Sequence, residues 1–470
     1  MAAELHRKPA HELAAMVRRR ELKPSELMEH TLARIEAANP SLNAFVALRA
    51  EAAIAEARSL DERLARKEDV GPLAGLPLGV KDLEDAAGLA TTFGSVPFRN
   101  NKPGADSVEV ARLKAAGAIV IGKTNAPEFG YTGFTKNLLF GVTRNPWNLE
   151  RTPGGSSGGS SAVIAGCVVP LATGSDGGGS IRIPACYTGC FGLKPSFGRI
   201  PNDAMLGMTR WDDTAVLGPL ARTVRDAAMY MDAAMGYHPA DPDSLPHPGI
   251  SYQAILERLP KKLRIAFHRD FGHIVQREVS REVEKAVGAF RDLGYEIAVL
   301  DEKVPETGQA WMRIGAGQQL AMLHEYLEKH RADFGRAFAN GTDAATRITW
   351  RHYGDAYRRR FEFNEWIRGV FERVDLLLTP TLPTEAFAAG GPPPGEIDGK
   401  PLADLMAALV FTYPFNLSGH PAASVRAGFT DSGLPCGLQI VAERHRDDLV
   451  LQAAYAYEQA CPWNDKWPEI

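Results

Sequence analysis

Residues 154–198 read GGSSGGSSAVIAGCVVPLATGSDGGGSIRIPACYTGCFGLKPSFG, and this stretch decides how the rest of the chain is interpreted. Twelve of its residues are glycine and seven are serine, and only Asp176, Arg182 and Lys194 carry charge. So few charges predict that the segment is buried. Apolar runs recur every few residues, which argues against a flexible Gly/Ser linker. Because glycine permits unusual backbone angles and close approach to a ligand, we take this segment as the candidate functional centre.

The sequence on either side predicts strands and helices in alternation. LPLGV (76–80) and AIVI (118–121) are short apolar runs typical of buried strands, and SVEVARLKAAG (107–117) predicts a helix that ends at Gly117. This order indicates a βαβ unit, and hence a parallel or mixed sheet covered by helices. Later strands are expected at LRIAF (263–267), EIAVL (296–300), DLLLT (375–379), ASVRA and GLQIVA, and later helices at 221–236, 277–292, 308–334, 352–373 and 446–460.

The 470 residues favour a single domain, 1–470, over several. A length prior of roughly 150 residues per domain would allow about three, but no linker or internal repeat divides the chain. Residues 1–70 predict a helical N-terminal arm, with an apolar stripe after residue 10, a helix opening at Pro24 and another over about 48–67. Residues 71–230 contain the Gly/Ser-rich centre. The Pro/Gly-rich segment 379–400 is interpreted as either a lid or a surface connection.

Composition narrows the classes of partner. The 53 basic and 57 acidic residues give a net charge of −4 with no domain-scale basic patch, so no nucleic acid partner is expected. Charges interrupt every apolar stretch near the N-terminus and no run of about 18 apolar residues occurs, so neither a secretory signal nor a membrane partner is expected. The five cysteines are an odd number, which favours reduced thiols and a cytoplasmic location. Cys186 and Cys190 lack the spacing and neighbouring histidine of a metal site.

Two short motifs compete for the centre. GAIVIGKT (117–124) fits a phosphate-binding loop, but its four middle residues predict a strand whose N–H groups belong to a sheet. A G-x-S-x-G match places Ser156 or Ser157 at the nucleophile position of an α/β-hydrolase. No strand-like run precedes Gly154, however, so neither motif is favoured.

Longer blocks resemble the amidase signature family. They follow the family's order and extend from about residue 10 to the end of the chain. The resemblance implies an α/β fold with a mixed central sheet between layers of helices, and hydrolysis of a linear carboxamide without a metal or organic cofactor. The blocks are PLGVKD (77–82), TPGGSSGGSSA (152–162), GSDGGGSIRIPA (174–185), FGLKPSFGRIP (191–201), DTAVLGPLARTVRD (213–226), PFNLSGHPAASV and GLPCGLQIV.

The resemblance also implies a Ser–cis-Ser–Lys triad. Ser180 matches the nucleophile, and Ser156, which precedes it by the family's 24 residues, matches the bridging serine with a cis link to Gly155. Lys81 matches the base, and Ser157 matches a serine that hydrogen-bonds this lysine. The chemistry is sound, because a lysine accepts a proton only when uncharged and burial lowers its pKa. Ser156 and Ser157 also suit the cap of a helix starting near Gly158.

The resemblance also suggests a function for the glycines that precede the proposed nucleophile. The N–H groups of Gly177, Gly178, Gly179 and Ser180 can point at one spot, which would form an oxyanion hole. Asp176 and Arg182 are interpreted as a structural ion pair that holds the same loop.

The substrate side is less defined. TNAPEFGYTGFT (124–135) resembles the family segment that lines the acyl site, with Gly130, Tyr131 and Thr132 in the matching stretch; packing is an equal interpretation for Tyr131. Residues 300–405 correspond to the region in which the family varies most. Its large side chains are candidates to line a substrate pocket, although core packing is favoured for each; they are Trp311, Met312, Met322 and Tyr326.

Three other functions stay open. One is the amidotransferase subunit that acts on misacylated tRNA, which needs partner subunits and ammonia; EFGYTGFTKNLLFGVTRNPWN looks more like stand-alone amidases. Another is hydrolysis of carbamates, esters or aryl acylamides by the same site. The third is a binding protein without catalytic activity. The presence of both Lys81 and Ser180 argues against it. The expected partner is a small-molecule amide; the sequence defines neither its acyl and amine groups nor the oligomeric state, a homodimer included.

Overall fold

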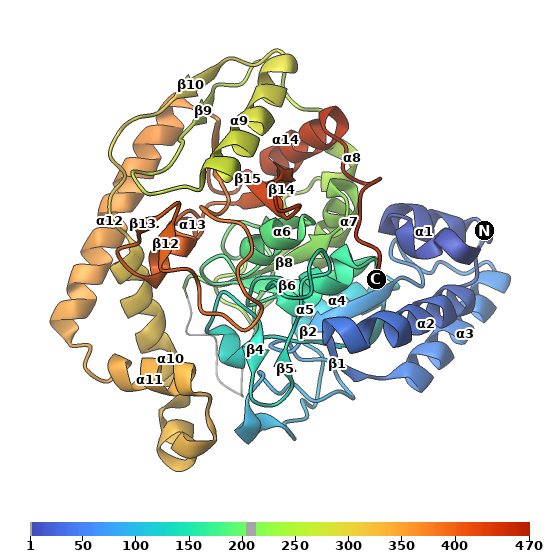
Figure 1. Ribbon diagram of the computed structural model, residues 1–470. Helices are drawn as coiled ribbons and strands as arrows, with labels where there is room; N and C mark the ends of the chain where they lie inside the picture. Colours follow the sequence, from blue (N-terminus) through green and yellow to red (C-terminus); the bar gives the residue numbers. More distant parts are fainter. Residues whose placement is uncertain (1, 204–212) are drawn as a thin grey trace.

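The computed structural model describes residues 2–203 and 213–470. Its centre is a mixed sheet flanked by helices, which confirms the expected α/β fold class (Figure 1). Eleven strands form it: β1 (Phe45–Leu48), β2 (Pro77–Lys81), β3 (Ile119–Thr124), β6 (Leu171–Asp176), β7 (Phe191–Lys194), β8 (Val216–Ala221), β9 (Ile265–Phe267), β10 (Ile297–Val299), β11 (Leu376–Pro380), β14 (Ala422–Phe429) and β15 (Pro435–Ala442). Their order across the sheet is β1-β3-β2-β6-β8-β7-β14-β15-β11-β9-β10.

The predicted βαβ unit is present. Strands β2 and β3 pair in parallel, with Pro77 opposite Ile119, and α4 (Val108–Ala115) connects them. Ser107 caps this helix by accepting a hydrogen bond from the Val110 N–H. Gly117 follows it at φ +102°, where a β-carbon would lie 2.3 Å from the Val70 carbonyl oxygen. GAIVIGKT is thus a sheet strand with its preceding turn, as its apolar middle predicts.

The N-terminal arm contains the three expected helices, α1 (Ala10–Arg18), α2 (Pro24–Leu42) and α3 (Ala50–Ala65). It also contains strand β1, which was not predicted. This strand pairs antiparallel with β3 at one edge of the sheet. A strand of four residues is too short for its burial pattern to stand out in the sequence. The arm therefore contributes to the sheet as well as covering it.

The Gly/Ser-rich centre is buried and structured. It forms α5 (Gly158–Ala165), strand β6, α6 (Arg182–Thr188) and strand β7, and every residue of α5 is buried. Gly159 lies so close to β3 that a β-carbon there would be 2.3 Å from the Asn125 nitrogen. Strand β8 pairs antiparallel with both β6 and β7 and was not predicted. Since β8 ends at Ala221, the next helix, α7 (Val224–Ala234), starts three residues later than expected.

The C-terminal half adds the outer helices and five strands of the central sheet. Helices α10 (Gly308–His330), α11 (Arg336–Ala345) and α12 (Trp350–Arg373) form a lobe at one side of the molecule (Figure 1). Strands β14 and β15 lie between β7 and β11, so the end of the chain lies beside its Gly/Ser-rich centre. Segment 379–400 is bonded to residues 150–152 through Thr152 N to Phe387 O (2.8 Å) and Ala389 N to Glu150 O (2.9 Å).

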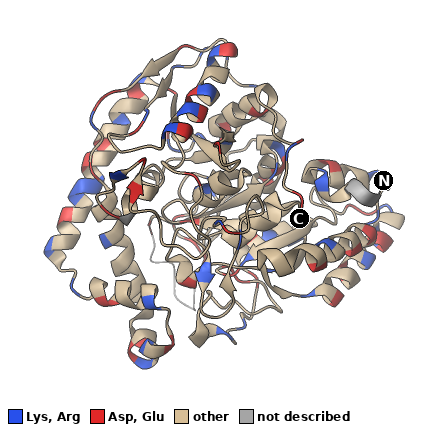
Figure 2. Cartoon of the chain, in the orientation of Figure 1, with Lys and Arg blue, Asp and Glu red and all other residues tan. Residues whose placement is uncertain are grey.

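The remaining elements are short or peripheral. Acidic and basic residues are interspersed along the outer helices, while the centre carries few charged residues (Figure 2). None of the helices in the described residues is long and apolar enough to span a membrane. The other elements are α8 (Tyr252–Ile255), α9 (Arg277–Asp292), α13 (Pro414–Ser418), α14 (Asp447–Ala460), the 3₁₀ turns η1 (Ala2–Arg7), η2 (Val96–Phe98), η3 (Glu128–Gly130), η4 (Arg331–Asp333) and η5 (Leu405–Leu409), and the hairpins β4 (Lys136–Asn137) with β5 (Gly141–Val142) and β12 (Glu396–Ile397) with β13 (Lys400–Pro401).

Candidate active site

Lys81 is the centre of a buried polar cluster. It is the last residue of β2, is fully buried, and has its Nζ atom 2.8 Å from the hydroxyl oxygens of both Ser156 and Ser157. Nζ also lies 2.9 Å from Ser175 Oγ and 3.2 Å from the Ser175 carbonyl oxygen. The two predicted residues Ser156 and Ser157 are therefore brought to the lysine. Ser175 was missed, although it belongs to the same GSDGGGS block.

Burial sets the protonation of this lysine. Loss of hydration lowers the pKa of Lys81 to about 7, although the negative charges of Glu84 and Asp176 act in the opposite direction. Desolvation disfavours the charged ammonium, since the four oxygens that replace water around Nζ are neutral and none belongs to a carboxylate. Near neutral pH a substantial fraction of Lys81 is thus uncharged and able to accept a proton.

The loop that carries Ser156 is held in close packing. Its Gly155–Ser156 peptide bond is cis, as expected. A β-carbon on Gly155 would lie 2.7 Å from both the Phe134 nitrogen and the Thr132 carbonyl oxygen, so only glycine fits. Ser157 stands at the start of α5 but makes no side-chain cap, since its hydroxyl is bonded to Lys81. The expected capping role is therefore absent for Ser157.

Ser180 ends the turn that follows β6 and is partly buried. Its carbonyl oxygen accepts a hydrogen bond from the Ser157 N–H at 3.0 Å, which joins the two serine loops. Within residues 2–203 and 213–470, the Ser180 hydroxyl has no hydrogen-bond partner. The structure thus brings Lys81 and Ser156 into contact and joins Ser180 to Ser157 through the backbone, with the Ser180 hydroxyl uncommitted. Hydrogen bonds that operate during catalysis often form only once substrate is bound.

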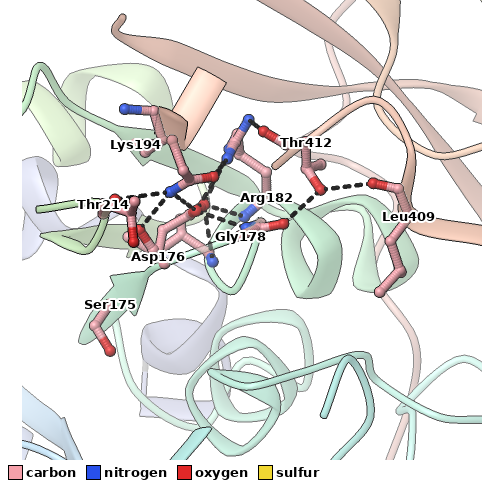
Figure 3. Close-up of polar contacts among 12 residues, drawn as sticks. Ser175, Asp176, Gly178, Arg182, Lys194, Thr214, Leu409 and Thr412 are labelled. Atoms are coloured by element: carbon pink, nitrogen blue, oxygen red, sulfur yellow. Dashed lines mark hydrogen bonds and ion pairs between the residues drawn. The ribbon is translucent and has the colours of Figure 1, made fainter. Parts of the chain in front are cut away.

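The carbonyl groups of the turn at 176–180 all accept hydrogen bonds. Because C=O and N–H point in opposite directions across a trans peptide, these bonds fix where each following N–H points. Figure 3 shows one of them, with Thr412 lying between Gly178 and Leu409. The bonds are Asn416 Nδ2 to Asp176 O (2.7 Å), Trp311 Nε1 to Gly177 O (2.6 Å), Thr412 Oγ1 to Gly178 O (2.7 Å), Ile183 N to Gly179 O (2.6 Å) and Ser157 N to Ser180 O (3.0 Å).

One expected oxyanion donor is already occupied. The Gly179 N–H donates to Asp176 Oδ1 at 2.7 Å, so it is not free to bind a substrate oxygen. Gly179 also has φ +127°, a backbone conformation that favours glycine. The N–H groups of Gly177, Gly178 and Ser180 have no protein acceptor within the described residues. The candidate donor set is therefore smaller than the glycine pattern suggested.

Asp176 and Arg182 form the expected buried ion pair. Arg182 Nη2 lies 2.9 Å from Asp176 Oδ1, and both side chains are fully buried (Figure 3). The guanidinium holds the pKa of Asp176 well below its usual range, despite burial. Arg182 also donates to Gln439 at 2.7 Å and to Asn416 at 2.7 Å. This network fastens the turn to the C-terminal strands and explains why both charges can be buried.

The three predicted substrate residues take different positions. A β-carbon on Gly130 would lie 3.1 Å from Ser156 Oγ, so Gly130 borders the serine loop. Tyr131 packs edge-on against Phe338 of α11, with ring centroids 5.5 Å apart, and thus has the packing role that was weighed for it. The Thr132 hydroxyl donates to the Phe134 carbonyl oxygen at 2.7 Å. Only Gly130 is placed directly against a serine of the site.

Trp311 makes a contact with the site that the sequence did not predict. It lies in the first turn of α10 and was assigned to core packing, yet its indole N–H donates to the turn beside Ser180. Among the other large side chains of this region, Tyr326 packs at a tilt against Phe98, with centroids 4.8 Å apart, and Met312 is 38% exposed. The described residues contain no group of three His, Cys, Asp or Glu side chains suited to a metal ion.

Comparison with known proteins defines the family. The family model described as Amidase matches residues 26–451. The chain is 38% identical to an acylamidase of Rhodococcus erythropolis, with 99% of this chain and 98% of that protein covered. It is 34% identical to a glutamyl-tRNA(Gln) amidotransferase subunit of a Cyanothece species, with 96% and 97% covered. The chain therefore belongs to the amidase signature family.

A solved structure agrees with this assignment. A bacterial aryl acylamidase of the amidase signature family superposes with a TM-score of 0.92 at 34% identity, and 97% of each chain is covered. Fold, sequence and the buried Lys–Ser cluster thus point to one chemistry. The chain is an amidase, a hydrolase that cleaves linear carboxamide C–N bonds.

Proposed function

We propose that this amidase works through an acyl enzyme on Ser180, with Lys81 as the base and Ser156 as the proton bridge. The observation that carries the proposal is the fully buried Lys81 amine, 2.8 Å from Ser156 Oγ and with a pKa near 7. A serine hydroxyl is a weak nucleophile until a neighbouring base takes its proton. A neutral lysine connected through a second hydroxyl supplies that base in a site where none of the described histidines bonds these serines.

The proposed steps conserve every proton. Ser180 Oγ attacks the carbonyl carbon while its proton moves to Ser156, whose own proton moves to Lys81. The same route in reverse protonates the leaving nitrogen, and the C–N bond breaks to give an ester on Ser180. Water then attacks the ester carbon and gives its proton to the same relay. The C–O bond breaks, which releases the carboxylic acid and restores the Ser180 hydroxyl.

The developing negative charge is proposed to rest on the N–H groups of Gly177, Gly178 and Ser180. Their peptide planes are held from the carbonyl side, which supports a preorganised oxyanion hole. One such donor typically contributes about 3 to 4 kcal/mol to the transition state. Gly179 is left out of this set because its N–H is bonded to Asp176.

The proposed substrates are small acylamides, including aryl acylamides. The acylamidase and the aryl acylamidase to which the chain is similar support this class. We propose that the segment 130–132 lines the acyl side, since Gly130 borders Ser156. Carbamates and esters would react by the same acyl-transfer route. Their relative rates distinguish an amidase from an esterase.

The amidotransferase alternative rests on the similarity to the glutamyl-tRNA(Gln) amidotransferase protein. It is tested with the purified chain alone and a 4-nitroanilide of a short carboxylic acid. Turnover without any partner protein supports the stand-alone amidase. Absence of turnover, followed by activity once partner subunits and glutamine are supplied, would support the amidotransferase role.

The nucleophile is tested by labelling with a fluorophosphonate, followed by intact mass and peptide mapping. The expected result is one adduct on Ser180, which Lys81→Ala abolishes and Lys194→Met retains. Lys194 is a matched control because it is another fully buried lysine of the region whose pKa is lowered to about 7. An adduct on Ser156 or Ser157 would overturn the assignment of Ser180.

We also propose that the chain forms a homodimer through α12. Three aromatic side chains on one face of this helix are exposed: Trp350 by 90%, Tyr357 by 44% and Phe361 by 63%. An antiparallel pair of α12 helices would bury these aromatic side chains against the same side chains of a second copy. Light scattering should give a dimer for the native chain and a monomer for Trp350→Glu with Phe361→Glu. A monomeric native chain would contradict this.

A cytoplasmic location is proposed from the thiols. All five cysteines are free, and four of them are buried in the core. Such an arrangement suits a reducing compartment. Localisation of a tagged chain in cell fractions tests it.

A further inference from the structure

The catalytic turn has a supporting contact from the variable half of the chain. Trp311 Nε1 donates to the carbonyl oxygen of Gly177 at 2.6 Å. This carbonyl shares its peptide plane with the N–H of Gly178, one of the proposed oxyanion donors. An indole has one hydrogen-bond donor and no acceptor, so Trp311 can only be the donor in this bond and Gly177 only the acceptor.

We propose that Trp311 is a positioning residue for the oxyanion hole, acting through the Gly177–Gly178 peptide. The inference rests on the proposed acyl-enzyme function. Trp311 does not bind the substrate oxygen in this account. It fixes the direction of the Gly178 N–H from the opposite side of the peptide, because C=O and N–H are antiparallel in a trans peptide.

The bond also changes the donor strength of that N–H. A hydrogen bond accepted by a peptide carbonyl polarises the same peptide, and such cooperativity strengthens the next bond by roughly 10–30%. The gain matters most when the substrate oxygen becomes negative. It should therefore appear in kcat and much less in KM.

Packing keeps the indole in place. The Trp311 ring stacks on Tyr413, with centroids 5.6 Å apart and planes 24° from parallel. On its other side it lies against Gly178, where a β-carbon would be 2.2 Å from a ring carbon. Glycine at 178 is thus required for the ring to approach the turn.

A second contact from the same region reinforces the turn. Thr412, the neighbour of Tyr413, donates to the Gly178 carbonyl oxygen at 2.7 Å. Two consecutive peptides of the turn are therefore held by side chains from α10 and from the segment before α13. The two supports are connected to each other through the stacked Trp311 and Tyr413 rings.

The test is Trp311→Phe, which removes the N–H and keeps an aromatic ring. We expect kcat for an anilide to fall about ten-fold, a smaller loss than the 10²–10³ typical of deleting an oxyanion donor itself. KM should stay within about two-fold, because ground-state contacts are unchanged. Affinity for a short alkylboronic acid, which forms a tetrahedral adduct on the serine, should fall with kcat, and affinity for the carboxylate product should not.

Trp366→Phe is the matched control. Its indole nitrogen is buried and has no hydrogen-bond partner in the described residues, so the substitution loses only packing. It should leave kcat and boronate affinity unchanged. Trp311→His restores a ring N–H and should recover part of the lost kcat. If the Phe variant does not fold, the kcat of Trp311→Leu, which lacks a ring N–H, is compared with that of Trp311→His, which has one.

Two results would overturn the proposal. One is an unchanged kcat in folded Trp311→Phe. The other is a rise in KM without a change in kcat or in boronate affinity, which would make Trp311 a substrate-binding surface. An error in the proposed acyl-enzyme function is detected by a different experiment, because Ser180→Ala would then turn over substrate at the rate of the native chain.

Discussion

The Nζ atom of Lys81 lies 2.8 Å from Oγ of Ser156, and neither side chain is more than 2% exposed. The pair is thus shielded from bulk water, and the surrounding protein groups determine the protonation state of Lys81. Changes of charge near Lys81 should therefore be measurable in the rate.

Activity should rise with pH through about 7 and then level off. The folded-state pKa of Lys81 is depressed to about 7, so the active, uncharged amine predominates above this value and is lost below it. The measurement is kcat/KM for an anilide between pH 5.5 and 9.5, under conditions where acylation limits the rate. A profile that is flat over this range would rule out Lys81 as the base.

Glu84→Gln should move the acid limb of this profile to lower pH. The negative charge of Glu84 raises the pKa of Lys81 against the effect of burial, and the substitution removes that charge. With less electrostatic support for the ammonium, the lysine deprotonates earlier on titration. The comparison is the pH midpoint of kcat/KM in the two proteins; an upward shift would show that Glu84 acts in another way.

Ser157→Ala should leave measurable turnover, whereas Ser180→Ala should abolish it. Ser157 bonds the lysine but lies outside the proposed proton route, so its loss disturbs the position of Nζ without removing a reacting group. We expect kcat/KM to fall by roughly 10- to 100-fold, because a buried hydrogen-bonding group left without its partner costs about 1 to 3 kcal/mol. Equal inactivation of both variants would place Ser157 in the relay.

Arg182→Met should destabilise the fold strongly. Removal of one partner leaves the fully buried Asp176 carboxylate uncompensated, which typically costs about 3 to 5 kcal/mol. The free energy of unfolding from urea titration measures this. Arg19→Met is the control, since Arg19 pairs with Glu21 at the exposed end of α1 and should change stability little. Similar losses in both would contradict the buried-pair argument.

Gly288→Ala should stabilise the protein. Gly288 lies inside α9, and a β-carbon there would meet nothing within 4 Å. Alanine restricts the unfolded chain, so the gain should be about 0.5 to 1 kcal/mol with activity unchanged. Gly178→Ala should instead inactivate, because its β-carbon would collide with Trp311. Thermal unfolding and anilide turnover distinguish the two glycines.

Local patterns in the sequence were sufficient for part of the architecture. Strand β2, α4 and strand β3 were predicted because apolar runs bounded by glycine leave a clear trace in the sequence. Strand β1 was missed because it has only four residues, and β8 because Gly218 and Pro219 interrupt its apolar pattern. Propensity disfavours both residues in strands, and the pairing of β8 with β6 and β7 overrides it.

The sequence predicted only those contacts of the site whose residues lie in recognisable sequence motifs. Lys81, Ser156 and Ser157 do meet, and Asp176 pairs with Arg182. The occupied N–H of Gly179 could not be foreseen, because it depends on the orientation of single peptide planes. The Trp311 contact joins residues 134 positions apart, and it depends on how α10 packs against the turn.

The supports of the catalytic turn also set an order of events on the ribosome. Its carbonyl groups are held by Thr412 and Asn416, and its arginine by Gln439. Strands β14 and β15, which carry the last of these contacts, fill the gap between β7 and β11 in the sheet. A nascent chain that has not yet emerged past Gln439 therefore carries all three proposed catalytic residues before the contacts that hold the turn can form.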